Sequence, residues 1–159
     1  MNKVLVPIVI FVAIIAGGVG ASIWKKNQAV DNSPYPPVGA QLLDLGTTPD
    51  ELMAIGATRR KNKPDPLTAY QGLWISEPGW EGTVEIVADE PGGQTLRWQQ
   101  NGGAFWVVAV LKNTDSRVKV GSVVRVVGMF EDANSVISDY SPMPQYRVIV
   151  KNAKIIEIK

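Results

Sequence analysis

The sequence predicts a mainly β protein in which a single N-terminal transmembrane helix is followed by a small five-stranded barrel. Three observations lead to this prediction: an uncharged run over residues 4–24, short alternating stretches from Trp80 onward, and an Asn101-Gly102 pair typical of a hairpin turn. The 159 residues then divide into an anchor at 1–26, a connecting segment at 27–66 and a barrel domain at 67–159.

Histidine and cysteine are both absent from the chain, and this excludes several kinds of site. Without imidazole or thiolate there is no Ser-His-Asp triad, no disulfide and no zinc or iron–sulfur site of the usual ligands. The formal net charge is +1, but residues 67–159 carry nine basic and ten acidic side chains, a net charge of −1. A domain of that charge is not a typical nucleic-acid binder. We expect no enzyme activity, no metal and no cofactor.

The predicted anchor runs from Val4 to Trp24, 21 residues without a charge, between Lys3 and Lys25-Lys26. As a helix it would be about 31 Å long, which matches a hydrocarbon core of about 30 Å. A cleaved signal peptide is the alternative, because small residues at 19–21 resemble a cleavage site. The flanking positive charges nearly balance. Because a short N-terminal anchor followed by one domain resembles bacterial signal-anchored proteins, we favour a single-pass protein of the inner (cytoplasmic) membrane with its C-terminal domain in the periplasm or an equivalent space.

One face of this helix carries small residues at every fourth position: Ala13, Gly17 and Ala21. Small side chains let another transmembrane helix approach closely, so the stripe predicts packing against other membrane subunits. The alternative is that the stripe has no packing role, because glycine and alanine are common in membrane spans.

Residues 27–47 read as an irregular, proline-containing linker, and a short helix is expected over residues 48–61. Thr48, Pro49 and Glu51 fit an N-cap, the first helical position and a capping box. A helix of this length is marginal alone, so it must dock on the barrel or on a neighbouring subunit.

A basic cluster lies at the end of that helix: Arg59, Arg60, Lys61 and Lys63. Three interpretations compete: a solvated helix end that complements the helix dipole, contact with anionic headgroups or an acidic partner, and nucleic-acid binding. The solvated helix end is the simplest of these.

Five strands are predicted, at residues 80–88, 95–100, 104–111, 122–130 and 145–158. The apolar run at 104–111 indicates burial on both faces, and Gly128 suggests a bulge. Residues 131–144 are expected to form a long loop, and the last strand is expected to bend near Lys151-Asn152.

This strand pattern resembles the OB-fold. The similar stretches are Gly82-Thr83-Val84, the strand Val120–Gly128 with glycines at 121 and 128, and the final strand from Tyr146 to Ile158. The resemblance implies a small closed barrel with glycines that let the sheet turn and coil. An SH3-like barrel or a small sandwich is the alternative. An anchored OB domain also resembles the periplasmic haem chaperone of cytochrome c maturation, but that family attaches haem through a histidine, which this chain lacks.

Aromatic residues mark the candidate contact sites of the domain. Trp74 and Trp80, with Tyr70 nearby, either close one end of the barrel or form an interaction patch. Tyr140 and Met143 lie in the expected proline-containing loop, which would present them to a partner.

Two other groups of residues have the chemistry of possible sites. Nucleic acid could contact Arg97, Trp98, Phe105 and Trp106, and catalysis or Ca²⁺ binding could use the acidic pairs Asp89-Glu90 and Glu131-Asp132. Core packing and polar turn ends explain them better.

The leading functional hypothesis is therefore a non-enzymatic, membrane-anchored accessory subunit of a multi-subunit membrane complex. Its expected partners are other membrane-protein subunits and the lipid bilayer, and no nucleic acid. A stand-alone periplasmic ligand-binding or chaperone-like protein is the alternative.

Overall fold

A computed structural model describes residues 35–138 and 141–159 of the chain. The predicted anchor, with Ala13, Gly17 and Ala21, lies outside the described residues, and so does Tyr140. Among the described residues, no helix has the length and apolar character needed to cross a membrane. The elements in chain order are α2 (Pro49–Ala57), β1 (Trp80–Thr83), β2 (Ile86–Glu90), β3 (Gly93–Gln100), the 3₁₀ turn η1 (Asn101–Gly103), β4 (Phe105–Leu111), β5 (Val123–Ser138) and β6 (Ser141–Ile158).

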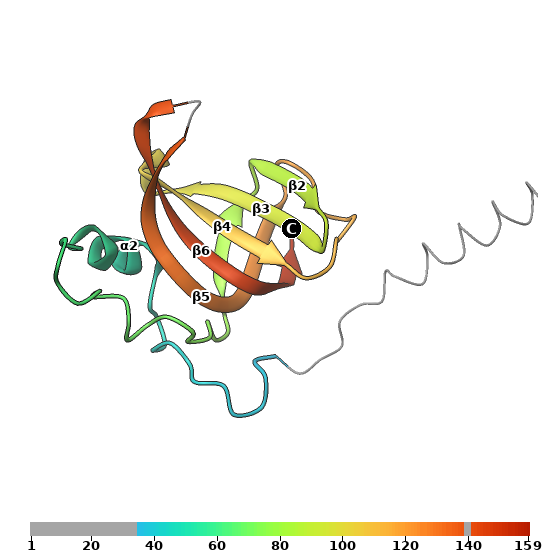
Figure 1. The fold of residues 1–159 in the computed structure, drawn as a ribbon. Helices are drawn as coiled ribbons and strands as arrows, with labels where there is room; N and C mark the ends of the chain where they lie inside the picture. Colours follow the sequence, from blue (N-terminus) through green and yellow to red (C-terminus); the bar gives the residue numbers. More distant parts are fainter. Residues whose placement is uncertain (1–34, 139–140) are drawn as a thin grey trace, which may run out of the picture. The chain divides into compact units, whose positions relative to one another are not determined.

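The strands form one curled, six-stranded sheet in the order β1-β5-β6-β4-β3-β2, which confirms a mainly β, barrel-like fold (Figure 1). β4 and β6 pair in parallel, and the other neighbours are antiparallel. β1 and β2 stand at opposite ends of this order, although only Val84 and Glu85 separate them in the chain. Val84 N–H donates to the Ser122 carbonyl, whereas Glu85 N–H donates to that of Arg97. The chain thus switches partners between these two residues, and the switch curls the sheet.

At this switch β1 crosses close over the side chain of Trp98 on β3, and Gly82 is the residue that allows the close approach. A Cβ atom on Gly82 would lie 2.1 Å from atoms of the Trp98 indole, so the ring packs directly against the β1 backbone. Trp98 is completely buried and fills the interior beside Leu96 and Val107.

Three sequence expectations for the sheet are confirmed or nearly so. The β3–β4 hairpin forms, but it turns through η1, whose Asn101 and Gly102 both have positive φ. β5 changes register between Val127 and Met129, which confirms the bulge at Gly128. β6 bends at Asn152, where φ is +50°. Burial on both faces of β4 is only partial, since fully buried residues alternate with half-buried ones.

The predicted loop at residues 131–144 is wrong, because β5 and β6 continue through it as paired strands up to Ser138 and Ser141. Pro142 and Pro144 suggested a loop. Among the described residues, however, this part of β6 pairs only with β5, and proline is tolerated at such an edge. The register also slips between Val136 and Ser138, opposite the prolines.

α2 has the expected capping box: Glu51 N–H donates to Thr48 Oγ1 at 3.2 Å, and Thr48 N–H donates to the Glu51 carboxylate at 3.0 Å. The helix ends at Ala57, earlier than the expected residue 61. Leu52 and Met53 are buried in the same core as the sheet. The helix therefore docks on its own domain, the first of the two alternatives.

We call residues 35–48 the strap. It has no helix or long strand, but it is attached to the sheet. Leu43 N–H donates to the Trp74 carbonyl at 2.9 Å, and Ile75 N–H donates to the Gly128 carbonyl at 2.8 Å. Tyr35 donates its hydroxyl to the Ile75 carbonyl at 3.0 Å. The strap and residues 72–75 thus extend the β5 edge outward, and the C-terminal part of the predicted linker belongs to the folded domain.

Candidate functional site

The β5–β6 hairpin projects beyond the rest of the sheet. We call its paired ends, residues 134–138 and 141–147, the arm; in Figure 1 it is the orange-to-red ribbon that rises past the ends of β3 and β4. β4 begins to pair with β6 at Arg147, and within the described part of the chain the strand segments before that point pair only with each other. Met143 is 72% exposed and Tyr146 is 42% exposed. The arm therefore presents apolar surface on a two-stranded ribbon.

A polar network holds the root of the arm. Arg59 donates to both Asp65 oxygens, at 2.9 and 2.6 Å, and to Asp132 Oδ1 at 2.5 Å. Asp132 Oδ2 accepts from Asn134 Nδ2 at 2.7 Å, and Asn134 Oδ1 accepts from Arg147 Nε at 3.0 Å. This arm-root network joins the segment after α2 to β5 and then to β6.

The electrostatics of the network favour its charged form. The hydrogen bond from Arg59 holds the pKa of Asp65 below its ordinary value. Burial alone would raise the pKa of Asp132, but hydrogen bonds from Arg59 and Asn134 outweigh burial and lower it. The two aspartates in turn raise the pKa of Arg59. A guanidinium held by two carboxylates is a structural clamp, because none of these groups is poised to exchange a proton near neutral pH.

α2 adds a steric contact to the same clamp. A Cβ atom on Gly56 would come within 2.5 Å of the Ala133 carbonyl oxygen, so the helix lies directly on the β5 backbone. The same carbonyl accepts from Arg59 at 3.2 Å. The helix and the residue shortly after it therefore fix the point at which the arm leaves the sheet.

The structure separates the members of the predicted basic cluster. Arg59 is half-buried in the arm-root network, whereas Arg60, Lys61 and Lys63 are exposed. The sequence drew attention to Arg59 only as one of four positive charges. The alternation of Asp132 and Asn134 on one face of a strand was the available signal for its partners, but it was hidden by the expectation of a loop.

The tryptophan cluster is largely packed. Trp80 is 6% exposed, and its indole Nε1 donates to the Thr47 carbonyl at 2.9 Å. Trp74 is half-buried, with its ring 5.3 Å from that of Tyr35 in an edge-on arrangement. Tyr70 packs against the core. These contacts place Trp80 and much of Trp74 in packing between the strap and the sheet.

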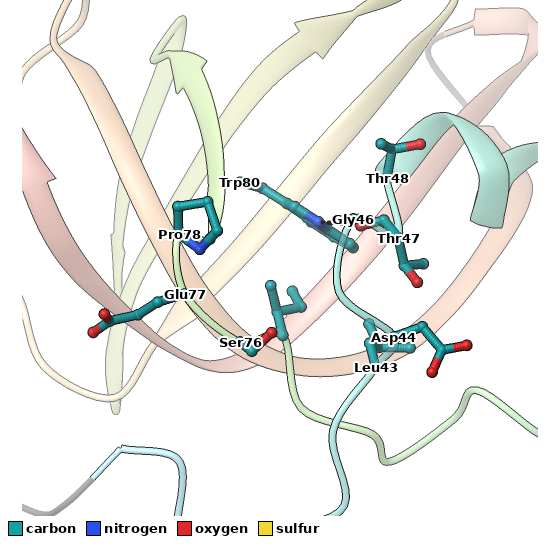
Figure 2. Close-up of a pocket in the computed structure, with 11 residues that line it drawn as sticks. Leu43, Asp44, Gly46, Thr47, Thr48, Ser76, Glu77, Pro78 and Trp80 are labelled. Atoms are coloured by element: carbon teal, nitrogen blue, oxygen red, sulfur yellow. Dashed lines mark hydrogen bonds between the residues drawn. The ribbon is translucent and has the colours of Figure 1, made fainter.

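A shallow cavity of about 150 Å³ lies between the strap and residues 75–80. In Figure 2 the Trp80 indole points toward Gly46 and Thr47, while the carboxylates of Asp44 and Glu77 point away from one another. Pockets for small molecules and cofactors usually measure about 300–1,000 Å³. The cavity is therefore too small to support a ligand site of that kind.

Four of the remaining described carboxylates, Glu81, Asp115, Glu131 and Glu157, form ion pairs at the surface. Glu81 contacts Arg125 at 2.7 Å and Lys159 at 2.9 Å, and these partners lower its pKa. Glu131 pairs with Lys151, and Asp89 accepts from Gln94. No group of three acidic side chains suited to a metal ion occurs among the described residues.

The nucleic-acid candidates are divided between surface and core. Arg97 is exposed, whereas Trp98 and Phe105 are buried and Trp106 is half-buried. Trp98 cannot stack on a base from that position.

Comparisons with known protein families, curated proteins and solved structures find no match for this chain.

Proposed function

We propose that this chain is a non-enzymatic accessory subunit of a multi-subunit membrane complex, anchored by residues 1–26 with its domain on the periplasmic or equivalent side. The observation that carries the proposal is the arm. A two-stranded ribbon is marginally stable in water by itself, yet here it extends past the sheet and carries exposed Met143 and Tyr146. Such a ribbon gains support from a protein partner.

The arm-root network suits this role. Arg59 joins Asp65 to Asp132, and Asn134 extends the contact to Arg147 on β6. The arm is thus held in one direction before it meets a partner, which reduces the ordering that binding requires. The anchor's stripe of Ala13, Gly17 and Ala21 would supply a second contact with the complex, within the membrane.

We further propose that the domain is an OB-like barrel. β1 and β2 count as two halves of one bent strand, which with β3 to β6 makes five strands. Two glycines support this proposal: Gly121 lies shortly before β5, the fourth of these strands, and Gly128 lies at the bulge within it. One continuous sheet gives no support to the sandwich alternative.

The test is purification of the full chain from native membranes in mild detergent. We expect stoichiometric partner subunits to accompany it. Replacing residues 136–145 with Asn-Gly would shorten the arm to a hairpin closed by the Ser135–Tyr146 pair, and it should reduce partner recovery about tenfold or more.

Val120→Ser is the matched control, because Val120 is 67% exposed but lies on the connection between β4 and β5. It should leave partner recovery unchanged. A monodisperse monomer from native membranes would overturn the proposal, and full recovery with the shortened arm would remove the arm from it.

A further inference from the structure

Two turns in the strap have the same construction. Ala40 N–H donates to the Pro37 carbonyl at 3.0 Å, and Thr47 N–H donates to the Asp44 carbonyl at 3.0 Å. The third residue of each turn is a glycine with positive φ, Gly39 at +81° and Gly46 at +95°. A glycine of that conformation is what a type II turn requires at its third position. The second residue, at the outer corner, is therefore Val38 in one turn and Leu45 in the other.

These two corner residues are unusually apolar for their positions. Val38 is 92% exposed and Leu45 is 86% exposed, and Leu42 between the turns is 48% exposed. Exposed turns are normally built from glycine, proline, asparagine, aspartate and serine. The domain itself does not bury these side chains, so their apolar character serves no packing purpose inside it.

Contacts between the strap and the rest of the domain fix the backbone of both turns. Leu43, between the two turns, is 4% exposed and pairs with Trp74. Thr47 accepts from the buried Trp80 indole, and Tyr35 is tied to Ile75. The strap therefore presents its apolar corners from a fixed backbone, and burying them outside the domain would need little further ordering.

The position of the strap in the chain identifies what covers it. Ten residues, 25–34, separate the end of the predicted membrane span from Tyr35. Even fully extended, the chain from Trp24 to Tyr35 reaches at most about 36–40 Å. Residues 35–47 contain one charged side chain, Asp44, so little charge has to be desolvated near a membrane.

We propose that Val38 and Leu45 insert into the interfacial region of the bilayer that holds the anchor, so that the strap is a foot on which the domain rests. This inference rests on the proposed membrane anchor and adds a second, lipid-contacting site. It also sets an orientation, because the side of the domain on which the strap covers Trp80 would then face the lipid.

The absence of native cysteine makes a direct test possible, since one introduced cysteine is the only labelling site. Val38→Cys and Leu45→Cys would be made separately in the full chain. Each would be labelled with an environment-sensitive fluorophore and placed in nanodiscs of phosphatidylethanolamine and phosphatidylglycerol containing headgroup spin-labelled lipid. Val120→Cys is the control, because that exposed residue lies near the opposite end of β1 from Trp80. Circular dichroism would verify that each variant is folded.

Insertion predicts a blue-shifted emission and about twofold or greater excess quenching at positions 38 and 45 over position 120. Equal quenching at all three positions would overturn the inference while leaving the anchor intact. Labels shielded from water in native membranes but not quenched in nanodiscs would show that a protein covers the strap, which also overturns it but agrees with the proposed accessory role. Failure of the full chain to enter nanodiscs would reject the anchor and with it both proposals.

Discussion

Two regions of the sheet differ in how they use their strands: the place where β1 crosses Trp98, and the arm. At the crossing, Gly82 on β1 lets a large buried ring fill the interior, and β3, which carries Trp98, pairs with both β2 and β4. In the arm, two strands pair with each other and expose Met143 and Tyr146. The first arrangement supplies stability, and the second supplies accessible surface. The arm-root network lies between these two regions. We therefore expect the effect of mutations on the free energy of unfolding to decrease from the crossing, through this network, to the tip of the arm.

The largest effect is expected at the crossing. Gly82→Ala would place a methyl group 2.1 Å from the Trp98 indole, and such overpacking should lower the free energy of unfolding by about 2–3 kcal/mol. Chemical denaturation measures this loss. Trp98→Leu removes the clashing ring, so the double variant should be more stable than the sum of the two single losses predicts. Strict additivity would contradict the proposed contact.

An intermediate effect is expected at the root of the arm. Arg59→Met removes the hydrogen bonds to Asp65 and Asp132 and leaves Asp132 partly buried without its cation, so we expect a loss of about 1–3 kcal/mol. Hydrogen exchange should accelerate in the arm more than in β3. Lys61→Met, two residues away and exposed, is the matched control and should change stability by less than about 0.5 kcal/mol. Equal effects of the two variants would show that Arg59 does not clamp the arm.

The same network predicts a pH dependence. The pKa values of Asp65 and Asp132 lie below their ordinary value of 3.8, so their contribution is complete well above that value and disappears as pH falls through their lower folded-state pKa values. Urea denaturation between about pH 2 and 6 should therefore show stability decreasing with acid. The slope should be smaller in Arg59→Met. It should not vanish, because Glu81 and Asp115 also have lowered pKa values.

The smallest effect on stability is expected at the tip of the arm. Met143→Ser replaces a side chain that is 72% exposed, so the free energy of unfolding should change by at most about 0.5 kcal/mol. Partner recovery from native membranes should nevertheless decrease. A large loss of stability would mean that the tip is part of the core, and unchanged recovery would place the interface elsewhere.

Sequence reasoning worked where local signals and tertiary structure agree. The Thr48–Glu51 capping box, the Gly128 bulge and the bend at Asn152 are each specified by a few neighbouring residues, and all three are present. It failed at residues 131–144, because Pro142 and Pro144 read as a loop whether or not a strand lies beside them. Proline is compatible with a strand whose other edge is unpaired, and only the tertiary arrangement shows that edge.

The site was harder to foresee than the fold. Arg59 and Asp132 are 73 positions apart in the chain, and no local pattern connects them. The burial of Trp80 likewise depends on the strap, whose docking is not evident from its irregular, proline-containing sequence. The apolar corners at Val38 and Leu45 could have been read from two similar four-residue stretches, Pro-Val-Gly-Ala and Asp-Leu-Gly-Thr.

The parallel pairing of β4 with β6 has a consequence for when the domain can fold. β6 follows β4 and β5 in the chain, yet it lies between them near the middle of the sheet. Before β6 is in place, β5 and β4 have no strand between them, and the sheet has a gap at its centre. The β3–β4 hairpin can therefore form from local contacts alone, whereas the complete sheet waits for pairing between strands far apart in the chain, which is a slow kind of step in the folding of β proteins.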